Sequence, residues 1–289
     1  MKSLEPNLVE LDRYRNGKDM MPRVYIGDTH GDYEATRKIA ERFLPKGYLL
    51  GFLGDYGDRA LKPNGSIKNL FYVLKLKTEY PNNVVLLRGN HETFAIAHNG
   101  NKTGDLKTDL IVKFGKRVGN EYLNAFNEMF AQMPYTAVSE NGVIALHGGL
   151  PNAKNIDELR ALPKGIKHIR DDPVAEQILW SDADPDIKYT KDGSRGVGFD
   201  FSKEFFDHYM DLLNKSILLR GHDQRHKGYL FGNRLLTLFT SERYIGNGYI
   251  QGRIVAIDEK PEKKKHDIAS DMIVIDIDTN ERKRANDNQ

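Results

Sequence analysis

The chain has 289 residues, with 43 Lys and Arg against 41 Asp and Glu, and its formal net charge is +2. Apolar residues make up 39% of it and aromatic residues 10%, which excludes a disordered polymer and is enough for a sizeable core. The positive and negative charges are nearly equal in number, which argues against binding to nucleic acid or to an anionic membrane through bulk electrostatics. We therefore expect neither as a partner. Cysteine is absent, which excludes disulfides, thiolate nucleophiles, iron–sulfur clusters and Cys-bound zinc.

The pattern of apolar residues predicts neither a membrane span nor a secretion signal. No run of about 18 apolar residues occurs. Charged residues recur along the first part of the chain, which lacks the apolar stretch of a signal peptide. We therefore expect a cytoplasmic protein, and we expect it to be a monomer.

The first part of the chain repeats one pattern, in which a short apolar strand runs into a polar loop and then a helix. Residues 1–20 are interpreted as a polar lead-in with a short helix over 7–13. Strands are predicted at 23–26, 48–53 and 84–87, and helices at 33–43 and 67–80. This alternation is typical of an α/β domain, in which ligands collect beyond the carboxyl ends of the strands.

Beyond residue 97 the pattern changes mainly to strands. Residues 97–116 are predicted to form a partly ordered insertion, and 151–200 to be rich in loops. The other predicted elements are helices at 121–133 and 201–213 and strands at 136–138, 143–147, 216–220, 235–239, 253–258 and 272–278. A Lys-rich hairpin loop is predicted at 259–267, and the tail 281–289 is predicted to be disordered. Residues 21–280 are assigned to a single domain.

Asp, Asn and His side chains gather where the predicted strands end. They are Asp28 and His30, then Asp55 and Asp58, then Asn90 and His91, then His147, and last His222. Each cluster has a glycine beside it, and glycine allows the close backbone approach that lets short side chains converge. One such cluster is compatible with an ordinary turn, but five in order indicate a functional site.

The kinds of side chain in these clusters indicate a metal centre. Two carboxylates, one amide and three imidazoles suit Mn, Fe, Zn or Co rather than Ca. A carboxylate that bridges two ions would suit a binuclear centre, in which the ions lie roughly 3.5–4 Å apart.

The clusters also resemble the motifs of a known family. In order they are Gly27-Asp28-Thr29-His30-Gly31, Gly54-Asp55-Tyr56-Gly57-Asp58-Arg59, Gly89-Asn90-His91-Glu92, His147-Gly148-Gly149 and Gly221-His222, and together they resemble the calcineurin-like metallophosphoesterases. Leu87-Arg88, Leu179-Trp180-Ser181-Asp182, Arg195-Gly196 and Leu238-Phe239…Tyr244 narrow the resemblance to PPP-type Ser/Thr protein phosphatases, and the lack of regulatory-subunit features favours a prokaryotic member. The resemblance covers residues 20–258 and implies an α/β fold of four layers, in the order α-β-β-α.

The resemblance implies which side chains hold the metals. Asp28 and His30 would bind the first ion, and Asp55 would bridge both. Asn90, His147 and His222 would complete the coordination of the second ion. The implied cofactors are two divalent or trivalent ions, with Mn expected in vitro and Fe, Zn or Co as alternatives.

It also implies the roles of the other side chains. His91 would protonate the leaving alkoxide as general acid, and Asp58 would accept its other N–H. Arg59 and Arg195 would clamp the phosphoryl oxygens, and Tyr244 would line the pocket and donate to phosphate. Glu92 and Arg88 are expected to order their loop through ion pairs.

The implied activity is hydrolysis of phosphoserine and phosphothreonine, with phosphotyrosine as an extension, in phosphorylated proteins or peptides. A hydroxide bridging the two metals would attack phosphorus directly. One alternative is hydrolysis of dinucleoside polyphosphates or nucleic-acid phosphate ends, although the related enzymes tend to carry Ala and Asp where this chain has Gly148 and Glu92. The other is a phospho-binding pseudophosphatase, which would lack a ligand, whereas none is lacking.

The chain departs from the family's motifs in two places. Gly57 and Ala60 replace the usual Val and Gly of the second motif without removing a ligand. Residues 240–243 replace the usual small residue, Pro and Asn before Tyr244, which bears on substrate preference.

Overall fold

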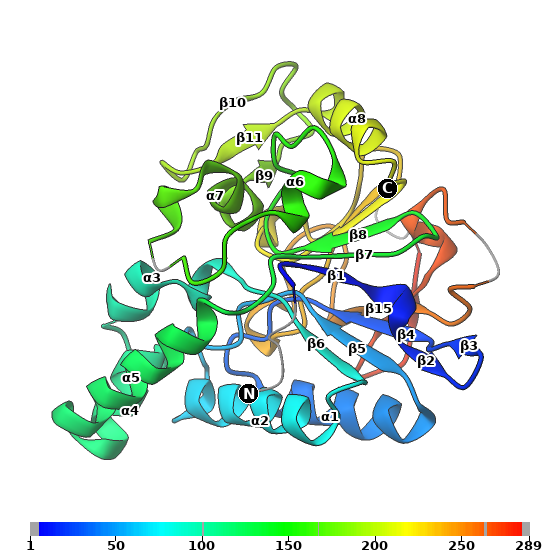
Figure 1. Cartoon of the computed structure of the whole chain (residues 1–289). Coiled ribbons are helices and arrows are strands. Elements are labelled where there is room, and N and C mark those ends of the chain that lie inside the picture. The colour runs from blue at the N-terminus through cyan, green and yellow to red at the C-terminus, as the bar shows by residue number, and fades with distance from the viewer. Residues whose placement is uncertain (1–5, 100, 167, 263–264, 285–289) are drawn as a thin grey trace.

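Two six-stranded β-sheets face each other at the centre of the molecule, and helices cover the outer face of each (Figure 1). This computed structural model describes residues 6–99, 101–166, 168–262 and 265–284. The first sheet has the strand order β17-β16-β15-β4-β5-β6, and the second has the order β1-β7-β8-β12-β14-β13. The predicted α/β architecture of four layers, α-β-β-α, is confirmed.

The strands are short. Those of the first sheet are β4 (Arg23–Ile26), β5 (Leu49–Phe52), β6 (Val84–Leu86), β15 (Ile254–Asp258), β16 (Ile273–Asp276) and β17 (Arg282–Lys283). Those of the second are β1 (Leu8–Glu10), β7 (Thr136–Val138), β8 (Val143–Leu146), β12 (Ile217–Arg220), β13 (Gly228–Leu230) and β14 (Leu235–Thr237). Two small sheets are formed by β2 (Arg15–Asn16) with β3 (Asp19–Met20), and by β9 (Asp182–Ala183), β10 (Lys191–Asp192) and β11 (Phe199–Phe201).

The helices divide between two outer layers (Figure 1). On the first sheet lie α1 (Tyr33–Phe43) and α2 (Gly65–Glu79), and after the short α3 (Phe94–Asn99) the hairpin of α4 (Leu106–Phe114) and α5 (Lys116–Phe130) packs beside α2. The second sheet is covered by α6 (Ile156–Arg160), α7 (Pro173–Trp180) and α8 (Lys203–Leu212).

Alternation of side chains along the strands builds three apolar cores. In β4, Val24 and Ile26 pack against the helices of the first layer, whereas Tyr25 packs between the two sheets. In β12, Leu218 faces the helices of the other layer and Leu219 faces the first sheet. Because successive side chains of a strand point to opposite faces, strands covered on both faces appear in the sequence as continuous apolar runs.

Both ends of the chain differ from the prediction. In place of a helix over 7–13, Leu8–Glu10 form β1, which pairs in parallel with β7, and only Leu11–Arg13 form a 3-10 turn. Leu8 and Val9 are both buried, because the open edge of β7 supplies a partner that a local pattern cannot reveal. In the tail predicted to be disordered, Arg282–Lys283 pair with β16; residues 285–289 lie outside the described residues.

The two segments predicted to be poorly structured contain regular elements. Residues 97–116 include all of α4, because Leu106 and Leu110 are buried against Leu123 of α5. Residues 151–200 include α6, α7, β9 and β10. The other predicted helices and strands are confirmed, with the predicted ends at 23–26, 33–43 and 136–138 and with shifted ends elsewhere. The predicted loop at 259–267 joins β15 to β16, although 263 and 264 lie outside the described residues.

The parallel strands bring their carboxyl ends to one edge. β4, β5 and β6 are parallel in the first sheet, and β8, β12 and β14 are parallel in the second. An isolated parallel bridge between Asp28 and Phe239 joins the chain beyond β4 to the chain beyond β14. The polar clusters that follow these strands therefore meet.

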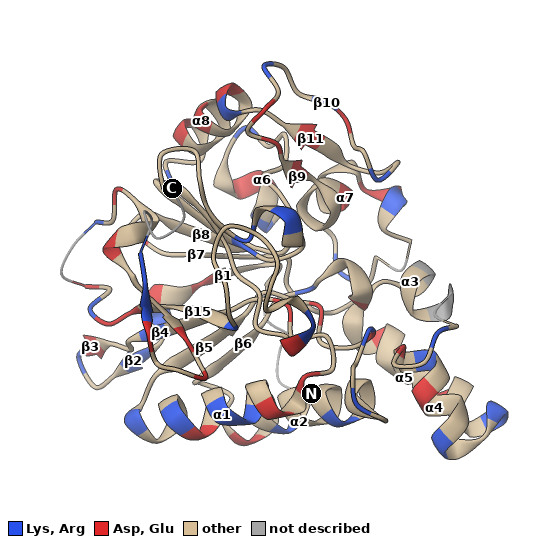
Figure 2. Cartoon of the chain, turned by 180° about the vertical axis from the view of Figure 1, so that it is seen from behind, with Lys and Arg blue, Asp and Glu red and all other residues tan. Residues whose placement is uncertain are grey.

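Charges of both signs are mixed along the outer helices. In the view of Figure 2, Lys and Arg are interspersed with Asp and Glu on α1, whereas α8 is mainly acidic and most charged residues of α2 are Lys. Among the residues that the structure describes, no helix has the length and apolar character needed to cross a membrane.

Candidate active site

Asp55 lies at the centre of the side chains predicted to bind metal. Its carboxylate oxygens are 3.4 Å from His30 Nε2 and 3.3 Å from His147 Nε2. Asp28 Oδ2 is 3.7 Å from His30 Nε2. All four residues are buried, so their donor atoms face a shared interior point rather than solvent.

Asn90 and His222 complete this group. Asn90 Oδ1 lies 2.8 Å from His147 Nε2 and 3.3 Å from His222 Nδ1. The backbone N–H of His222 donates to Asp28 Oδ1 at 3.0 Å, which joins two segments 194 positions apart in the sequence. The structure thus brings together all six predicted ligands.

The backbone of the site is strained. Five of its non-glycine residues have φ between 39° and 69°, in the left-handed region: His30, Asp55, Asp58, Arg59 and His222. Such residues cost of order 1–3 kcal/mol each and cluster at functional sites. Close approach also requires glycine, since a Cβ at Gly221 would lie 2.0 Å from Asp28 Oδ1.

The tautomers of two histidines indicate that a cation fits here. Nδ1 of His30 lies 3.0 Å from Gly57 O, and Nδ1 of His147 lies 2.9 Å from Leu53 O, so both N–H groups donate to carbonyls. Nε2 of each ring then carries a lone pair that faces Asp55. Lone pairs that face carboxylate oxygens repel unless a cation lies between them, and carbonyl-bound Nδ1–H groups are usual for metal-binding histidines.

The distances between donor atoms group the side chains differently from the predicted metal sites. Two groups share Asp55: one consists of His30, Asp55 and His91, and the other of Asp28, Asp55 and His147, with all atoms of a group within 4.8 Å. The sequence pairs Asp28 with His30 and leaves His91 free for catalysis. Both ways of grouping the side chains provide two metal sites that share Asp55. Replacing His91 can show which grouping is correct.

His91 and Asp58 form a buried pair. His91 Nδ1 lies 2.7 Å from Asp58 Oδ2, and Asp58 Oδ1 accepts from the N–H of Leu106, where α4 begins. Burial opposes the charged form of His91, but the nearby Asp55 and Asp58 outweigh it and raise the pKa of the imidazole. Nε2 of His91 has no hydrogen-bond partner among the described residues. A protonated His91 can therefore offer its Nε2–H to a ligand.

Glu92 holds the loop that carries Asp55. Its carboxylate accepts from the backbone N–H groups of Asp55, Tyr56 and Gly89 at 2.7–3.0 Å. Arg88 Nε donates to the backbone O of Glu92 at 2.9 Å. Both residues order the loop as expected, through backbone hydrogen bonds, and within the described part of the chain neither forms an ion pair.

Two cavities open beside the cluster and share two lining residues, Arg59 and Arg243. The arginine cavity, of about 360 Å³, is lined by Arg59, Arg195, His222, Gln224, Phe239, Arg243, Tyr244 and Asn247. The His91 cavity, of about 310 Å³, is lined by Asp58, Arg59, His91, Ile96, Asn101, Lys102, Thr103, Asp105 and Arg243. The three residues predicted to bind phosphate therefore share one cavity.

Each of these three side chains is held in place. Arg59 Nη1 lies 3.2 Å from Tyr244 OH and 3.4 Å from His30 Nε2. Arg195 Nε donates to the buried carboxylate of Asp182 at 2.5 Å. The two guanidinium groups are thus positioned before any ligand arrives.

Sequence reasoning missed two residues of this region. Arg243 lines both cavities, and its place directly before Tyr244 in a segment that departs from the family's motifs was the available signal. Lys227 is fully buried, and its Nζ donates to the carbonyls of Tyr244, Ile245 and Gly252. No local pattern distinguishes Lys227 from an exposed lysine.

Lys227→Met is expected to lower the free energy of unfolding by about 2 kcal/mol, because it removes the three hydrogen bonds that the buried ammonium donates to the carbonyls of Tyr244, Ile245 and Gly252. Burial already lowers the pKa of Lys227 to about 8, so part of the loss is offset by removal of a buried charge. Urea unfolding measures the change. Lys75→Met on the exposed face of α2 is the control and should stay within about 0.5 kcal/mol of wild type. A more stable Lys227→Met would show that the charge costs more than its hydrogen bonds contribute.

The metal-free protein is expected to lose stability as pH falls from 7 to 5. Burial lowers the pKa of His30 to about 3, so this ring stays neutral in the folded state while the unfolded state takes up a proton across that window. The unfolded state then binds more protons, which costs about 2 kcal/mol for this residue alone. Urea unfolding in a chelator at the two pH values measures it. His30→Gln should flatten the pH dependence, and His208→Gln on α8 should leave it as in wild type.

Known proteins are similar to this chain in sequence. The model of the calcineurin-like phosphoesterase family matches residues 21–226. A protein phosphatase 2A catalytic subunit of Dictyostelium discoideum is 30% identical over 248 residues, which are 84% of this chain and 75% of that protein. This chain therefore belongs to the calcineurin-like metallophosphoesterases, a class of hydrolases, and has PPP-type Ser/Thr phosphatases among its relatives.

Solved structures show the same fold. A protein serine/threonine phosphatase from Saccharomyces cerevisiae with similarity to human phosphatase PP5 superposes with a TM-score of 0.76 at 22% identity, over 93% of this chain and 83% of the other. A cold-active protein-tyrosine phosphatase of a psychrophilic Shewanella superposes with a TM-score of 0.63 at 14% identity, over 98% and 83%. At these identities the likeness concerns the fold alone.

Proposed function

We propose that this chain is a metal-dependent phosphoprotein phosphatase that hydrolyses phosphoserine and phosphothreonine. The observation that carries the proposal is the buried cluster around Asp55, which lies beside a cavity lined by Arg59 and Arg195. The Dictyostelium relative, itself a protein phosphatase, supports a phosphorylated protein as substrate.

The cluster would hold two metal ions through Asp28, His30, Asp55, Asn90, His147 and His222. Ions of this kind supply a water of lowered pKa and neutralise charge on the phosphoryl group. We expect Mn to serve in vitro, with Fe, Zn or Co as alternatives, since imidazole with carboxylate accepts all of these ions. The neutral tautomers of His30 and His147 need no proton release before they bind metal.

The remaining side chains act on the phosphoryl group and the leaving group. Arg59 and Arg195 bind the phosphoryl oxygens as guanidinium forks and orient phosphorus, with Tyr244 beside them. A water oxygen forms the new bond to phosphorus as the bond to the serine or threonine oxygen breaks. His91 gives its Nε2 proton to that leaving oxygen, and Asp58 keeps the ring oriented through Nδ1–H.

We also propose that residues 21–280 act as one catalytic domain. The strands of both sheets contribute to the same site, so neither sheet could form the site alone. β1 adds an edge strand to this domain from within the N-terminal lead-in.

A side-by-side assay tests the proposal. The Mn-loaded protein is given phosphoserine, phosphothreonine and phosphotyrosine peptides of one sequence and a dinucleoside tetraphosphate, and phosphate release is measured. We expect kcat/KM for phosphoserine and phosphothreonine to exceed the other two by about tenfold or more. Preference for the dinucleotide would replace this function with polyphosphate hydrolysis. No turnover of any substrate by fully loaded protein would favour a phospho-binding protein.

A further inference from the structure

Arg243 is an arginine beyond the two that the proposed function assigns to the phosphoryl group. It lines both the arginine cavity and the His91 cavity, a position that it shares with Arg59 alone among the lining residues. Its Nη1 donates to the backbone O of Arg59 at 3.3 Å. Among the described residues no carboxylate forms an ion pair with Arg243, whereas Arg195 is bound to Asp182. Its charge therefore remains available to a ligand.

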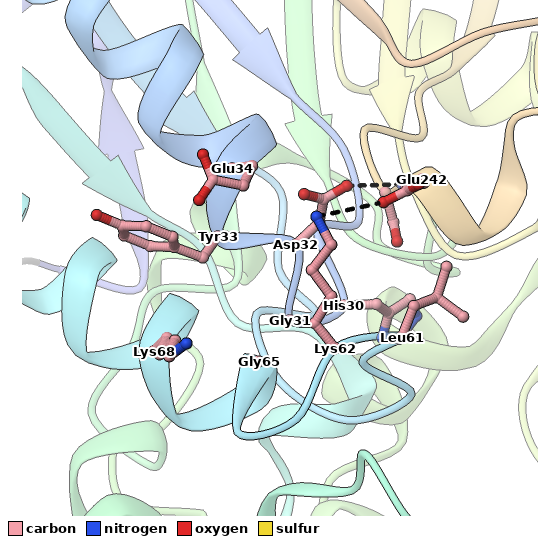
Figure 3. Close-up of a pocket in the computed structure, with 11 residues that line it drawn as sticks. His30, Gly31, Asp32, Tyr33, Glu34, Leu61, Lys62, Gly65, Lys68 and Glu242 are labelled. Carbon is pink, nitrogen blue, oxygen red and sulfur yellow. Dashed lines mark hydrogen bonds and ion pairs between the residues drawn. The ribbon is translucent and has the colours of Figure 1, made fainter.

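The backbone of Arg243 is fixed at the rim of the site. It belongs to the 3-10 turn Glu242–Tyr244, in which Ser241 Oγ accepts from Arg243 N at 3.3 Å. Asp32, the N-cap of α1, accepts from Glu242 N at 2.7 Å, and Lys62 Nζ lies 4.0 Å from Glu242 (Figure 3). The side chain therefore starts from a rigid base.

The arginine cavity offers two guanidinium groups, those of Arg59 and Arg243, that form no ion pair with a carboxylate of the described residues. Three arginines line it, and no carboxylate is among its described lining residues. Its volume of about 360 Å³ lies within the range of cavities that hold whole small ligands. A guanidinium group without a carboxylate partner matches a carboxylate or a phosphate in a bidentate geometry.

We propose that Arg243 binds a second anionic group of the substrate, next to the scissile phosphomonoester. Preferred substrates are then phosphopeptides in which a Glu, an Asp or a second phosphoresidue lies within a few positions of the phosphoserine. This inference rests on the proposed function. Arg243 acts as a specificity residue here, and the same anion recognition serves a carboxylate and a second phosphate.

Matched peptides and variants test this inference. Phosphoserine peptides carry neutral neighbours, or one Glu placed at each of the two positions on either side, or a second phosphoserine. The proteins are wild type, Arg243→Gln, Arg243→Lys and the control Arg117→Gln, whose side chain is 82% exposed on α5. The readout is the ratio of kcat/KM for the acidic peptide to that for the neutral one.

We expect a ratio above one in wild type, a fall of about tenfold in Arg243→Gln, a smaller fall in Arg243→Lys, and the wild-type ratio in Arg117→Gln. The Glu and second-phosphate peptides show which anion is preferred. An equal loss of kcat/KM for neutral and acidic peptides in Arg243→Gln would overturn the inference, as would an unchanged ratio.

Binding of phosphonate analogues of the same peptides separates this inference from the proposed function. Fluorescence anisotropy with Mn-loaded protein measures their Kd without turnover. If no phosphopeptide is hydrolysed but the analogues still show an acidic preference that depends on Arg243, the proposed function fails and the second anion site stands. If the Kd of the analogues changes neither with the acidic neighbour nor with replacement of Arg243, the second anion site is refuted.

Discussion

Asp55→Asn is expected to abolish tight binding of metal at both positions and to lower kcat/KM for a phosphoserine peptide by about 10³-fold or more. The reason is geometric, since Asp55 belongs to both groups of donor atoms and its carboxylate oxygens lie 3.4 Å and 3.3 Å from the Nε2 atoms of His30 and His147. An amide offers one neutral oxygen, which can neither bridge two ions nor offset their charge. Metal content after gel filtration and initial rates measure the two effects.

Stability measurements make this test independent of activity. At about 100 times its Kd, a metal stabilises the wild-type fold by about 2.7 kcal/mol. The free energy of unfolding of Asp55→Asn should rise far less on addition of Mn than that of the wild type. Without metal, the variant should unfold at a urea concentration close to that of the metal-free wild type. The control Asp211→Asn, whose side chain is 80% exposed, should keep the full gain. If Mn stabilises Asp55→Asn as much as it stabilises the wild type, Asp55 is not a metal ligand.

His91→Asn is expected to lower kcat/KM for phosphoserine peptides by about 10²–10⁴-fold while both metal ions remain bound. Nε2 of His91 is buried without a hydrogen-bond partner among the described residues, and Asp58 holds the opposite nitrogen, so the ring is oriented to deliver a proton. The loss should shrink for an aryl phosphate such as p-nitrophenyl phosphate, because its leaving oxygen needs no proton. Metal analysis and rates with both substrates measure this.

The same variant decides how the donor atoms are divided. Loss of one metal ion from His91→Asn would make His91 a ligand, as the group of His30, Asp55 and His91 permits, and would end its assignment as general acid. Equal losses for alkyl and aryl substrates with both ions bound would also count against proton donation. His208→Asn on α8 controls for the general effect of replacing a histidine.

Asp58 should act through His91. Asp58→Asn alone is expected to cost about 10–100-fold in kcat/KM, as for other partners that orient a functional imidazole. Added to His91→Asn, it should cost little more, because the ring that it orients is already gone. Additive losses would give Asp58 a separate role, one candidate being support of α4 through Leu106.

Much of the fold and site could be predicted from the sequence because the relevant signals are local. Apolar runs of strand length such as 84–87, each followed by Gly with Asp, Asn or His, predicted both the strands and the polar side chains at their ends. Apolar periodicity likewise predicted α1 and α2. The signal failed where a partner distant in the sequence decides the structure: β1 depends on the edge of β7, and α4 on the apolar face of α5.

The sequence by itself determined the α/β class, the kinds of side chain at the candidate site and, through the resemblance of its motifs, the family and its layered fold, because motifs depend on residue types at short spacing. Only the tertiary structure decided how the pieces meet. Packing of the two sheets on a shared apolar core brings His222 to Asp28 across 194 positions and buries Lys227 beneath the turn that carries Tyr244. The same packing places Arg243 between the two cavities. Such placements depend on the register between two sheets, which is fixed by contacts over their whole faces and is therefore invisible in any local stretch of residues.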